Sequence, residues 1–318
     1  MKRVIATVGP SLLQKFPISK IHQDKYIYRI NGAHGDKKSI IQTIAEIRSQ
    51  VKHAEILIDL PGNKIRTKLR NSIQLQIETD FSINHEDFNY DHFHTHLKIG
   101  DEVYANDSIF KFIVKEITSD TIIFKSLSNG LLLTNKGLHV REIHADIPFL
   151  FEKDLELIEI ANSQKVSYVG LSFVRNVDDI QYAKSLIGKD VSIISKVETL
   201  AAVKNLDSIL QVVDNILVDR GDLSTEIGIE KIPIFQKYIL DKGNFYNKKV
   251  FLATQFLKNM EEKPLPTFPE VIDLYNTMKS GVHGIQLSEE TAIGHYPYEC
   301  LNLLENVMNE IIKEIPHF

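Results

Sequence analysis

The chain has 318 residues, of which 43% are hydrophobic and 25% are charged, the composition of one large globular domain or two unequal ones. Its 42 acidic residues outnumber its 37 lysines and arginines, which excludes nucleic acid as a principal partner because polyanion binding needs basic residues. The single cysteine, Cys300, excludes an internal disulfide and a cysteine-rich zinc module. No apolar run reaches the ~20 residues of a membrane span, and Gly9 and Pro10 interrupt the N-terminal apolar stretch before it forms a signal peptide. We therefore expect a cytoplasmic protein without a membrane partner.

Eight short apolar runs have the composition of buried β-strands, and each ends abruptly in polar or charged residues. They cover residues 4–7, 26–30, 56–59, 166–172, 191–196, 215–219, 250–254 and 284–288. From the fourth run onward they alternate with helix-patterned segments at residues 178–187, 200–210, 269–279 and 297–312. Such alternation predicts parallel strands joined by right-handed helical crossovers. Eight units in this length predict an α/β fold, the (β/α)8 TIM barrel, with an open doubly wound sheet as the alternative.

One stretch, residues 68–144, interrupts this alternation. It contains short strand patterns at residues 72–77, 102–104, 109–117, 121–125 and 131–133, separated by turn signals such as Ser128-Asn129-Gly130. The pattern predicts a small all-β domain inserted after the third barrel strand, between a first barrel part at residues 1–67 and a second at residues 145–318. Because chemistry in a TIM barrel takes place at the C-terminal ends of the strands, a domain inserted there is expected to act as a lid.

Polar side chains follow the predicted strands, and closure of a barrel brings strand ends into one ring. Lys196 and Glu198 bring an ammonium and a carboxylate together, because alternation along an extended segment turns both side chains to the same side. Asp222, after the next strand, is placed to join Glu198 as an oxygen ligand of Mg²⁺ or Mn²⁺. Arg29, Arg66 and Lys196 supply positive charge around an anionic substrate. A structural ion-pair network is the alternative interpretation of the same residues.

The sequence lacks the common nucleotide-binding motifs but contains a cluster of histidines. No two glycines are separated by a single residue, so a GxGxxG motif is impossible, and no GxxxxGK[ST] sequence occurs. Any phosphate site must therefore use another arrangement. His92, His94 and His96, with His85 nearby, have a spacing that places three imidazoles on one strand face like a zinc site. A polar surface segment of the inserted domain is the favoured interpretation of these histidines.

The polar motifs, in their order along the chain, resemble those of the pyruvate kinase family. The matching segments are TVGPS at residues 7–11, RINGAHG at 29–35, DLPGNKIRT at 59–67, ISKVE at 194–198, DRGDL at 219–223, ATQ at 253–255, KPLPT at 263–267 and LSEETA at 287–292. The resemblance extends in collinear order over essentially the whole chain and implies the family's barrel domain and B lid domain. Since the chain ends after the eighth predicted barrel helix, the family's C-terminal regulatory domain is expected to be absent.

The resemblance implies a metal-dependent phosphotransferase that converts phosphoenolpyruvate and ADP into pyruvate and ATP, with Mg²⁺ or Mn²⁺ as its cofactor and these small molecules as its partners. The implied catalytic residues are Lys196, Arg29, Arg66 and Thr254. The implied metal ligands are Glu198 and Asp222. The implied substrate-binding groups are Lys196, Thr254 and the backbone N–H groups of Gly221 and Asp222. The implied nucleotide-binding residues are Asn31, His34, Arg66 and Lys136.

The chain departs from the family pattern in the monovalent-cation region, which corresponds to Asn31, Asp59 and Lys64. Ala33 and Leu60 stand where the family has Ser and Thr oxygen ligands, and Lys64 stands where a glutamate is common. Similarity to potassium-independent members implies that the Lys64 ammonium takes the place of K⁺. We therefore expect that K⁺ is not required.

Further departures bear on activity and assembly. Ile293 replaces a lysine near the nucleotide, and Asp219 and Ser224 replace Ala and Gly in the carboxylate-binding loop. Phe268 replaces an arginine of the usual subunit contact, so homo-oligomerisation is left open. These changes favour, as one alternative, a catalytically weak relative that binds the ligand. A lyase or aldolase acting on pyruvate-type substrates is the other alternative, because such barrels also hold a divalent metal with Glu and Asp.

Overall fold

The computed structural model describes residues 2–15, 17–106, 109–141, 143 and 147–313. Eight parallel strands close into a barrel in the spatial order β1-β16-β15-β14-β13-β12-β3-β2. They are β1 (Arg3–Thr7), β2 (Tyr26–Asn31), β3 (Glu55–Asp59), β12 (Tyr168–Leu171), β13 (Ser192–Val197), β14 (Asn215–Asp219), β15 (Lys249–Ala253) and β16 (Gly284–Leu287). The pairing of β1 with β16 closes the ring. The predicted (β/α)8 barrel is therefore confirmed, and the open sheet is wrong.

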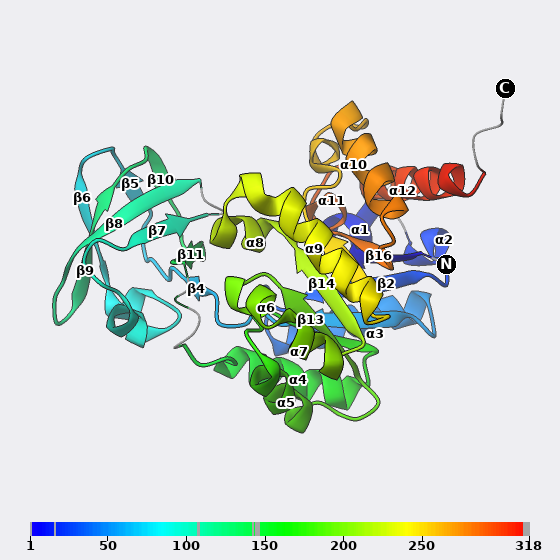
Figure 1. The fold of residues 1–318 in the computed structure, drawn as a ribbon, viewed down its shortest axis with the longest axis horizontal. Helices are drawn as coiled ribbons and strands as arrows, with labels where there is room; N and C mark the ends of the chain where they lie inside the picture. The colour runs from blue at the N-terminus through cyan, green and yellow to red at the C-terminus, as the bar shows by residue number, and fades with distance from the viewer. Residues whose placement is uncertain (1, 16, 107–108, 142, 144–146, 314–318) are drawn as a thin grey trace.

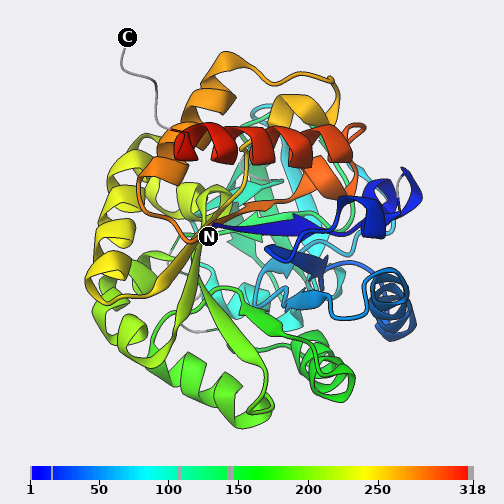
Figure 2. The same cartoon turned by 90° about the vertical axis from the view of Figure 1, so that its right-hand side faces the viewer.

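Helices surround the strands (Figure 2). They are α1 (Pro10–Lys15), α2 (Ile18–Ile21), α3 (Lys37–Gln50), α4 (Glu152–Gln164), α5 (Val177–Leu186), α6 (Leu200–Lys204), α7 (Leu206–Val212), α8 (Arg220–Ile227), α9 (Ile232–Phe245), α10 (Phe268–Lys279), α11 (Glu289–Ala292) and α12 (Pro297–Ile312), with the 3-10 helices η4 (Ile229–Lys231) and η5 (Lys258–Glu261). The helical pattern at residues 200–210 forms two helices, because Asn205 leaves helical geometry between α6 and α7. None of the helices in the described ranges is long and apolar enough for a membrane crossing.

Between β3 and β12 the chain forms a lobe of β-sheet that projects to one side of the barrel (Figure 1). One sheet has the order β4-β11-β7-β8-β9-β6, and β5 pairs with β10 in a second sheet. The strands are β4 (Ile65–Arg66), β5 (Ile73–Leu75), β6 (Asp80–Asn84), β7 (Glu102–Ala105), β8 (Phe110–Ile117), β9 (Thr121–Ser126), β10 (Gly130–Leu132) and β11 (Gly137–His139). The lobe has its own apolar core, which includes Phe88, Phe93 and Phe112. The predicted boundary at residues 144 and 145 lies outside the described residues.

The histidine-rich segment of this lobe forms two 3-10 helices, η1 (His85–Asp87) and η2 (Asp91–His96), and no strand face. The rings of His85 and His94 stack in parallel with their centroids 3.8 Å apart. Among the described residues, groups of three potential metal ligands occur only where carboxylates gather. The histidines therefore give no support to a zinc site.

Alternation of side chains along the barrel strands positions the polar residues at their ends. An apolar layer fills the barrel interior and consists of Ile5, Ile27, Leu57, Ile194, Leu217, Phe251 and Ala253. On five of these strands, the residue two positions further along the chain is polar and buried. These residues are Thr7, Arg29, Asp59, Lys196 and Asp219. The C-terminal end of the barrel interior thus carries a polar layer directly above an apolar one.

Candidate active site

Lys196 lies at the centre of this polar layer, with 7% of its side chain exposed. Its Nζ lies 3.2 Å from Oε2 of Glu198, 3.5 Å from Oδ2 of Asp219 and 3.7 Å from Oδ2 of Asp59. It also donates a hydrogen bond of 3.0 Å to the Ser172 hydroxyl. Burial by itself lowers the pKa of Lys196, but the three carboxylates outweigh burial and raise this pKa above its ordinary value. The lysine is therefore a permanent positive charge in the mouth of the barrel.

Arg29 holds Asp59 on the neighbouring strand. Two of its nitrogens lie 2.8 and 2.7 Å from Oδ2 of Asp59, and the third donates to the Thr7 hydroxyl at 2.9 Å. Burial raises the pKa of Asp59, but the charges of Lys196 and Arg29 lower it further than burial raises it. Gly170 leaves space for this carboxylate, because a Cβ there would lie 2.6 Å from Oδ1 of Asp59. The barrel mouth therefore holds a charged network in which the Asp59 carboxylate lies between the Lys196 and Arg29 cations.

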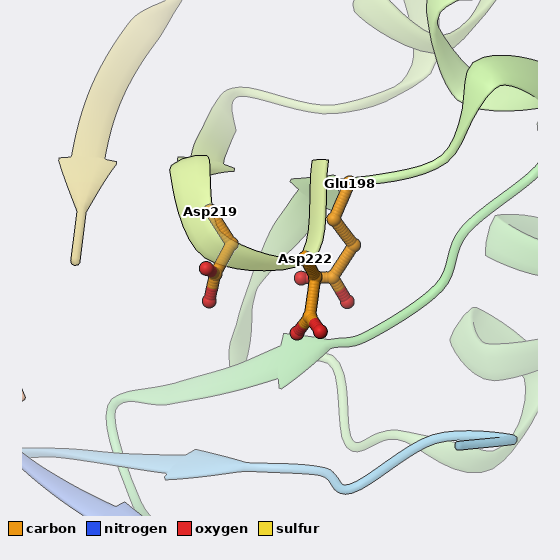
Figure 3. Close-up of side chains that lie close together, drawn as sticks. All are labelled: Glu198, Asp219 and Asp222. Atoms are coloured by element: carbon orange, nitrogen blue, oxygen red, sulfur yellow. The ribbon is translucent and has the colours of Figure 1, made fainter. Parts of the chain in front are cut away.

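Three carboxylates converge beside this network. Glu198, Asp219 and Asp222 each place one oxygen within 4.8 Å of the others (Figure 3). Val197 pairs with Val218 in the parallel register, so Glu198 and Asp219 follow as neighbours at the ends of β13 and β14. Asp219 is the N-cap of α8, and Asp222 lies in the first turn of that helix. Strand register and one helical turn therefore bring the three acids to one point.

These carboxylates fit a divalent cation, because hard cations prefer oxygen ligands. The side chain of Glu198 is fully buried, and within the part of the chain that the structure describes its Oε2 has the ion pair with Lys196 at 3.2 Å but no hydrogen bond. Burial raises the pKa of Glu198 and Asp219, and the opposing charge of Lys196 is not enough to reverse this. At Asp222 the Lys64 ammonium, 2.6 Å from Oδ1, outweighs burial and lowers the pKa. A bound cation would offset the repulsion among the three acids.

Thr254 follows β15 in a strained backbone conformation. Its φ is +74° and that of Gln255 is +56°, and positive φ is particularly unfavourable for a β-branched residue. The Thr254 hydroxyl accepts the N–H of Gly221 at 2.9 Å and donates to the Ala253 carbonyl at 2.7 Å. Strain of this kind persists only where the surroundings enforce it. The strand end therefore holds this hydroxyl against the start of α8.

Arg220 holds the strained backbone of Thr254 in place. Its guanidinium donates to the Thr254 carbonyl at 2.6 and 3.2 Å and lies 2.8 Å from Oδ2 of Asp273. It also lies over the ring of Phe256, 4.0 Å from the ring centroid. No role for Arg220 was predicted from the sequence. The structure makes it the residue that fixes the Thr254 backbone.

A cavity of about 700 Å³ opens next to the polar layer, at the ends of β1 and β2 and beside helices α1, α3 and α11. Asn31 and His34, two of the residues predicted for the nucleotide, line it together with Arg29. Burial, followed by the charge of Arg66, lowers the pKa of His34, so this ring is neutral at neutral pH. Ile293 also lines the cavity. The replacement of the family's lysine therefore changes a wall of this cavity.

Arg66 and Lys136 come together at the base of the β lobe, where β4 pairs with β11. The N–H of Thr67 donates to the Lys136 carbonyl at 3.0 Å, and Arg66 donates to the Asn135 carbonyl at 3.4 Å. This antiparallel pairing unites two residues that are far apart in the sequence and that the family resemblance assigns to one ligand.

One buried contact, which the sequence did not predict, joins the β lobe to the barrel. Nε2 of His139 on β11 lies 2.8 Å from Oε2 of Glu226 on α8, and both side chains are buried. The other oxygen of Glu226 accepts the N–H of Leu200 at 3.2 Å. Helix α8 also carries Asp222, so the lobe and the three-carboxylate cluster share one helix.

A closed (β/α)8 barrel with charged, buried side chains at the C-terminal ends of its strands defines a barrel enzyme. The family model of the pyruvate kinase barrel domain matches residues 1–301. The pyruvate kinase of Thermococcus litoralis is 34% identical over 96% of this chain and 68% of its own length. Those of Thermotoga maritima and Clostridium perfringens are each 32% identical, over 99% and 96% of this chain and 72% and 69% of their own lengths. The chain belongs to the pyruvate kinase family and is a transferase of the kinase type, in a family that generally needs a divalent metal ion.

The structure gathers the sequence-predicted residues into three neighbouring groups. The barrel mouth holds Arg29, Asp59, Lys64, Lys196, Glu198, Gly221, Asp222 and Thr254; the cavity holds Asn31 and His34; the base of the lobe holds Arg66 and Lys136. The position of Asp219 among the carboxylates was missed. Its two-residue spacing from the inward-facing Leu217 is the signal that reveals it.

Proposed function

We propose that this protein transfers the phosphoryl group of phosphoenolpyruvate to ADP, forming pyruvate and ATP. The observation that carries the proposal is the permanently charged Lys196 ammonium, which lies 3.2 Å from Glu198 at the barrel mouth. Phosphoryl transfer depends on positioning and on positive charge around the transferred group, with no covalent intermediate required. A buried lysine held by carboxylates and flanked by Arg29 provides that charge without any reorganisation during the reaction.

In the proposed reaction a β-phosphate oxygen of ADP attacks the phosphorus, and the bond from phosphorus to the enol oxygen breaks. Lys196 stabilises the negative charge that develops on the phosphoryl group and on the enolate oxygen. Arg29 and Arg66 hold phosphoryl oxygens in line for the attack. The enolate then takes a proton from solvent at its methylene carbon, and the Thr254 hydroxyl is proposed to lie beside that carbon.

Glu198 and Asp222 are the proposed ligands of Mg²⁺ or Mn²⁺. When bound, the ion neutralises charge on the substrate oxygens. We also propose that K⁺ is not required, because the Lys64 ammonium is already held beside Asp222, where it adds a positive charge to the carboxylate cluster.

The substrate carboxylate is proposed to bind the backbone N–H groups of Gly221 and Asp222, at the start of α8. The N–H of Gly221 donates to the hydroxyl of Thr254 and to Oδ1 of Asp219 at 2.9 and 3.2 Å. Binding of the carboxylate would therefore redirect this N–H from those two acceptors. In this proposal Thr254 would lie at the edge of the substrate.

The cavity lined by Asn31 and His34 is the proposed nucleotide site, with Arg66 and Lys136 approaching from the β lobe. We propose that residues 68–144 form a lid that excludes water over these groups. Replacing residues 68–144 by a short linker is expected to leave a folded barrel that binds Mn²⁺ but turns over about 100-fold more slowly, because the nucleotide is no longer positioned. Full turnover of a folded, shortened chain would contradict the lid.

The decisive experiment is an assay of ATP and pyruvate formation from phosphoenolpyruvate and ADP with Mg²⁺ or Mn²⁺. Wild-type protein is expected to form both products in equal amounts, and Lys196→Met is expected to lose at least about 10³-fold in turnover, the scale of one lost charge-stabilising group. Lys189→Met, an exposed lysine before β13, is the matched control and should remain fully active. Absence of both products from the wild-type reaction would refute the proposed function.

A further inference from the structure

Asp219 stands where the family pattern has alanine, so the resemblance gives it no role. It ends β14, and its side chain turns into the barrel mouth as that of Leu217 turns into the barrel interior. The residue is buried, with 7% exposed. Its Oδ2 lies 3.5 Å from the Lys196 ammonium, and its Oδ1 accepts the N–H of Gly221 at 3.2 Å. A carboxylate has therefore been added inside the charged centre of the site.

We propose that Asp219 is a third protein ligand of the divalent-metal site, beside Glu198 and Asp222. The inference rests on the proposed function only in taking the bound ion to be Mg²⁺ or Mn²⁺. One oxygen of each residue lies within 4.8 Å of the others, and the three carboxylates point into the same space (Figure 3). Oε2 of Glu198 is fully buried, and apart from its ion pair with the Lys196 ammonium at 3.2 Å it has no hydrogen-bond partner among the described residues, so a cation at this point would complete its surroundings.

The balance of charge supports a cation at this point. The cluster contains four carboxylates, from Asp59, Glu198, Asp219 and Asp222, and three cationic side chains, from Arg29, Lys64 and Lys196. With all of these groups ionised, one carboxylate is in excess in a buried region, where an uncompensated charge is costly. A divalent ion shared by the three neighbouring acids removes that excess.

The Lys64 ammonium accounts for how the chain accommodates the additional acid. Lys64 lies 2.6 Å from Asp222, and its side chain is 16% exposed. It stands where the family commonly has glutamate, so the chain carries both a new cation and a new carboxylate near Asp222. Gly137 makes room for the lysine, because a Cβ there would lie 2.5 Å from Cε of Lys64. The positive charge of Lys64 offsets the negative charge that Asp219 adds, and one oxygen each of Glu198, Asp219 and Asp222 is left for the metal.

The simpler role for Asp219 is that of a helix cap and a counterion for Lys196. Asparagine separates the two roles, because its side-chain oxygen still caps α8 while its metal affinity is far lower. Glu198→Gln and Asp222→Asn provide the reference effects of losing a ligand. Asp214→Asn is the matched control, since that exposed residue precedes the opposite end of the same strand and pairs with Lys248.

The experiment titrates the full chain with Mn²⁺ alone, in the absence of phosphoenolpyruvate and ADP, and follows free Mn²⁺ by electron paramagnetic resonance. Asp219→Asn is expected to raise the Kd for Mn²⁺ at least ten-fold, or about 1.4 kcal/mol, as in the two reference variants. The number of water molecules on bound Mn²⁺, measured by proton relaxation, is expected to rise by about one. Asp214→Asn should change neither quantity.

An unchanged Kd in Asp219→Asn overturns the inference. A raised Kd with an unchanged number of bound waters also overturns it, because that result describes a distant charge and not a ligand. If Asp219→Asn does not fold, the Kd for Mn²⁺ and the number of bound waters are measured on Asp219→Ser, because a serine hydroxyl also caps helices. Failure of phosphoryl transfer with tight Mn²⁺ binding in the wild-type chain would refute the proposed function and leave this inference standing.

Discussion

The two ends of the barrel use the same kinds of charged residue in opposite ways. At the N-terminal end, Arg3 pairs with Glu55 at 2.6 Å, and the two side chains are 18% and 36% exposed. At the C-terminal end, Arg29 pairs with Asp59 at 2.7 Å, and the exposed fractions fall to 9% and 3%. Pairs that keep contact with solvent contribute little to stability, whereas fully buried pairs carry a large desolvation cost. The comparison indicates that the C-terminal pairs are kept for chemistry and not for stability.

Breaking a pair at the C-terminal end should therefore have the largest effect. Asp59→Asn removes the carboxylate that Arg29 contacts through two nitrogens and leaves a buried guanidinium without its charge partner. We expect a loss of about 3 kcal/mol in the free energy of unfolding, measured with urea, because an uncompensated buried charge is strongly destabilising. A loss below about 1 kcal/mol, the range of exposed pairs, would remove the distinction between the two ends.

Lys64 tests the same difference between the two barrel ends, because its ammonium adds a positive charge at the C-terminal end, where charge is expected to serve catalysis. We expect wild-type turnover to change by less than ten-fold, or about 1.4 kcal/mol of barrier, when KCl replaces tetramethylammonium chloride at constant ionic strength. Lys64→Met is expected to become dependent on KCl, with a stimulation of about ten-fold. Lys68→Met, an exposed lysine on the same segment, is the matched control and should behave as wild type. A ten-fold stimulation of the wild-type enzyme by KCl would show that Lys64 does not replace K⁺.

The smallest effect is expected at the N-terminal end. Arg3→Met and Glu55→Gln break this partly exposed pair, and each should lower the free energy of unfolding by no more than about 1 kcal/mol. Turnover should remain at the wild-type level, because the pair lies at the opposite end of the strands from Lys196. A ten-fold loss of turnover in either variant, at temperatures where the chain is folded, would contradict the functional division between the two ends.

The barrel strands were predictable because each is a continuous buried run with a polar end. The pattern at residues 215–219 matches β14 at both ends. In the β lobe, β6 and β11 were not predicted, since β6 has only one fully buried residue and β11 has three residues in all. Short strands of this kind are defined by their partners, which a local pattern does not contain.

The site was predictable as far as local spacing reaches. Lys196 and Glu198 follow from alternation along one strand. Asp219 was missed as a member of the carboxylate group because an aspartate between a strand and a helix is also the expected helix cap. The pair of His139 and Glu226 has no local signal, because it depends on how the β lobe rests on α8.

That pair also constrains how the two parts of the molecule can move. Glu226 and Asp222 lie one turn apart on α8, and His139 lies on the strand that pairs with the one carrying Arg66. A rotation of the β lobe must either break a buried 2.8 Å contact or pull α8 along with it. Since binding and motion are thermodynamically reciprocal, any ligand that displaces the first turn of α8 also changes the energy needed to swing the lobe. Helix α8 thus couples the position of the β lobe to ligand binding at the barrel mouth.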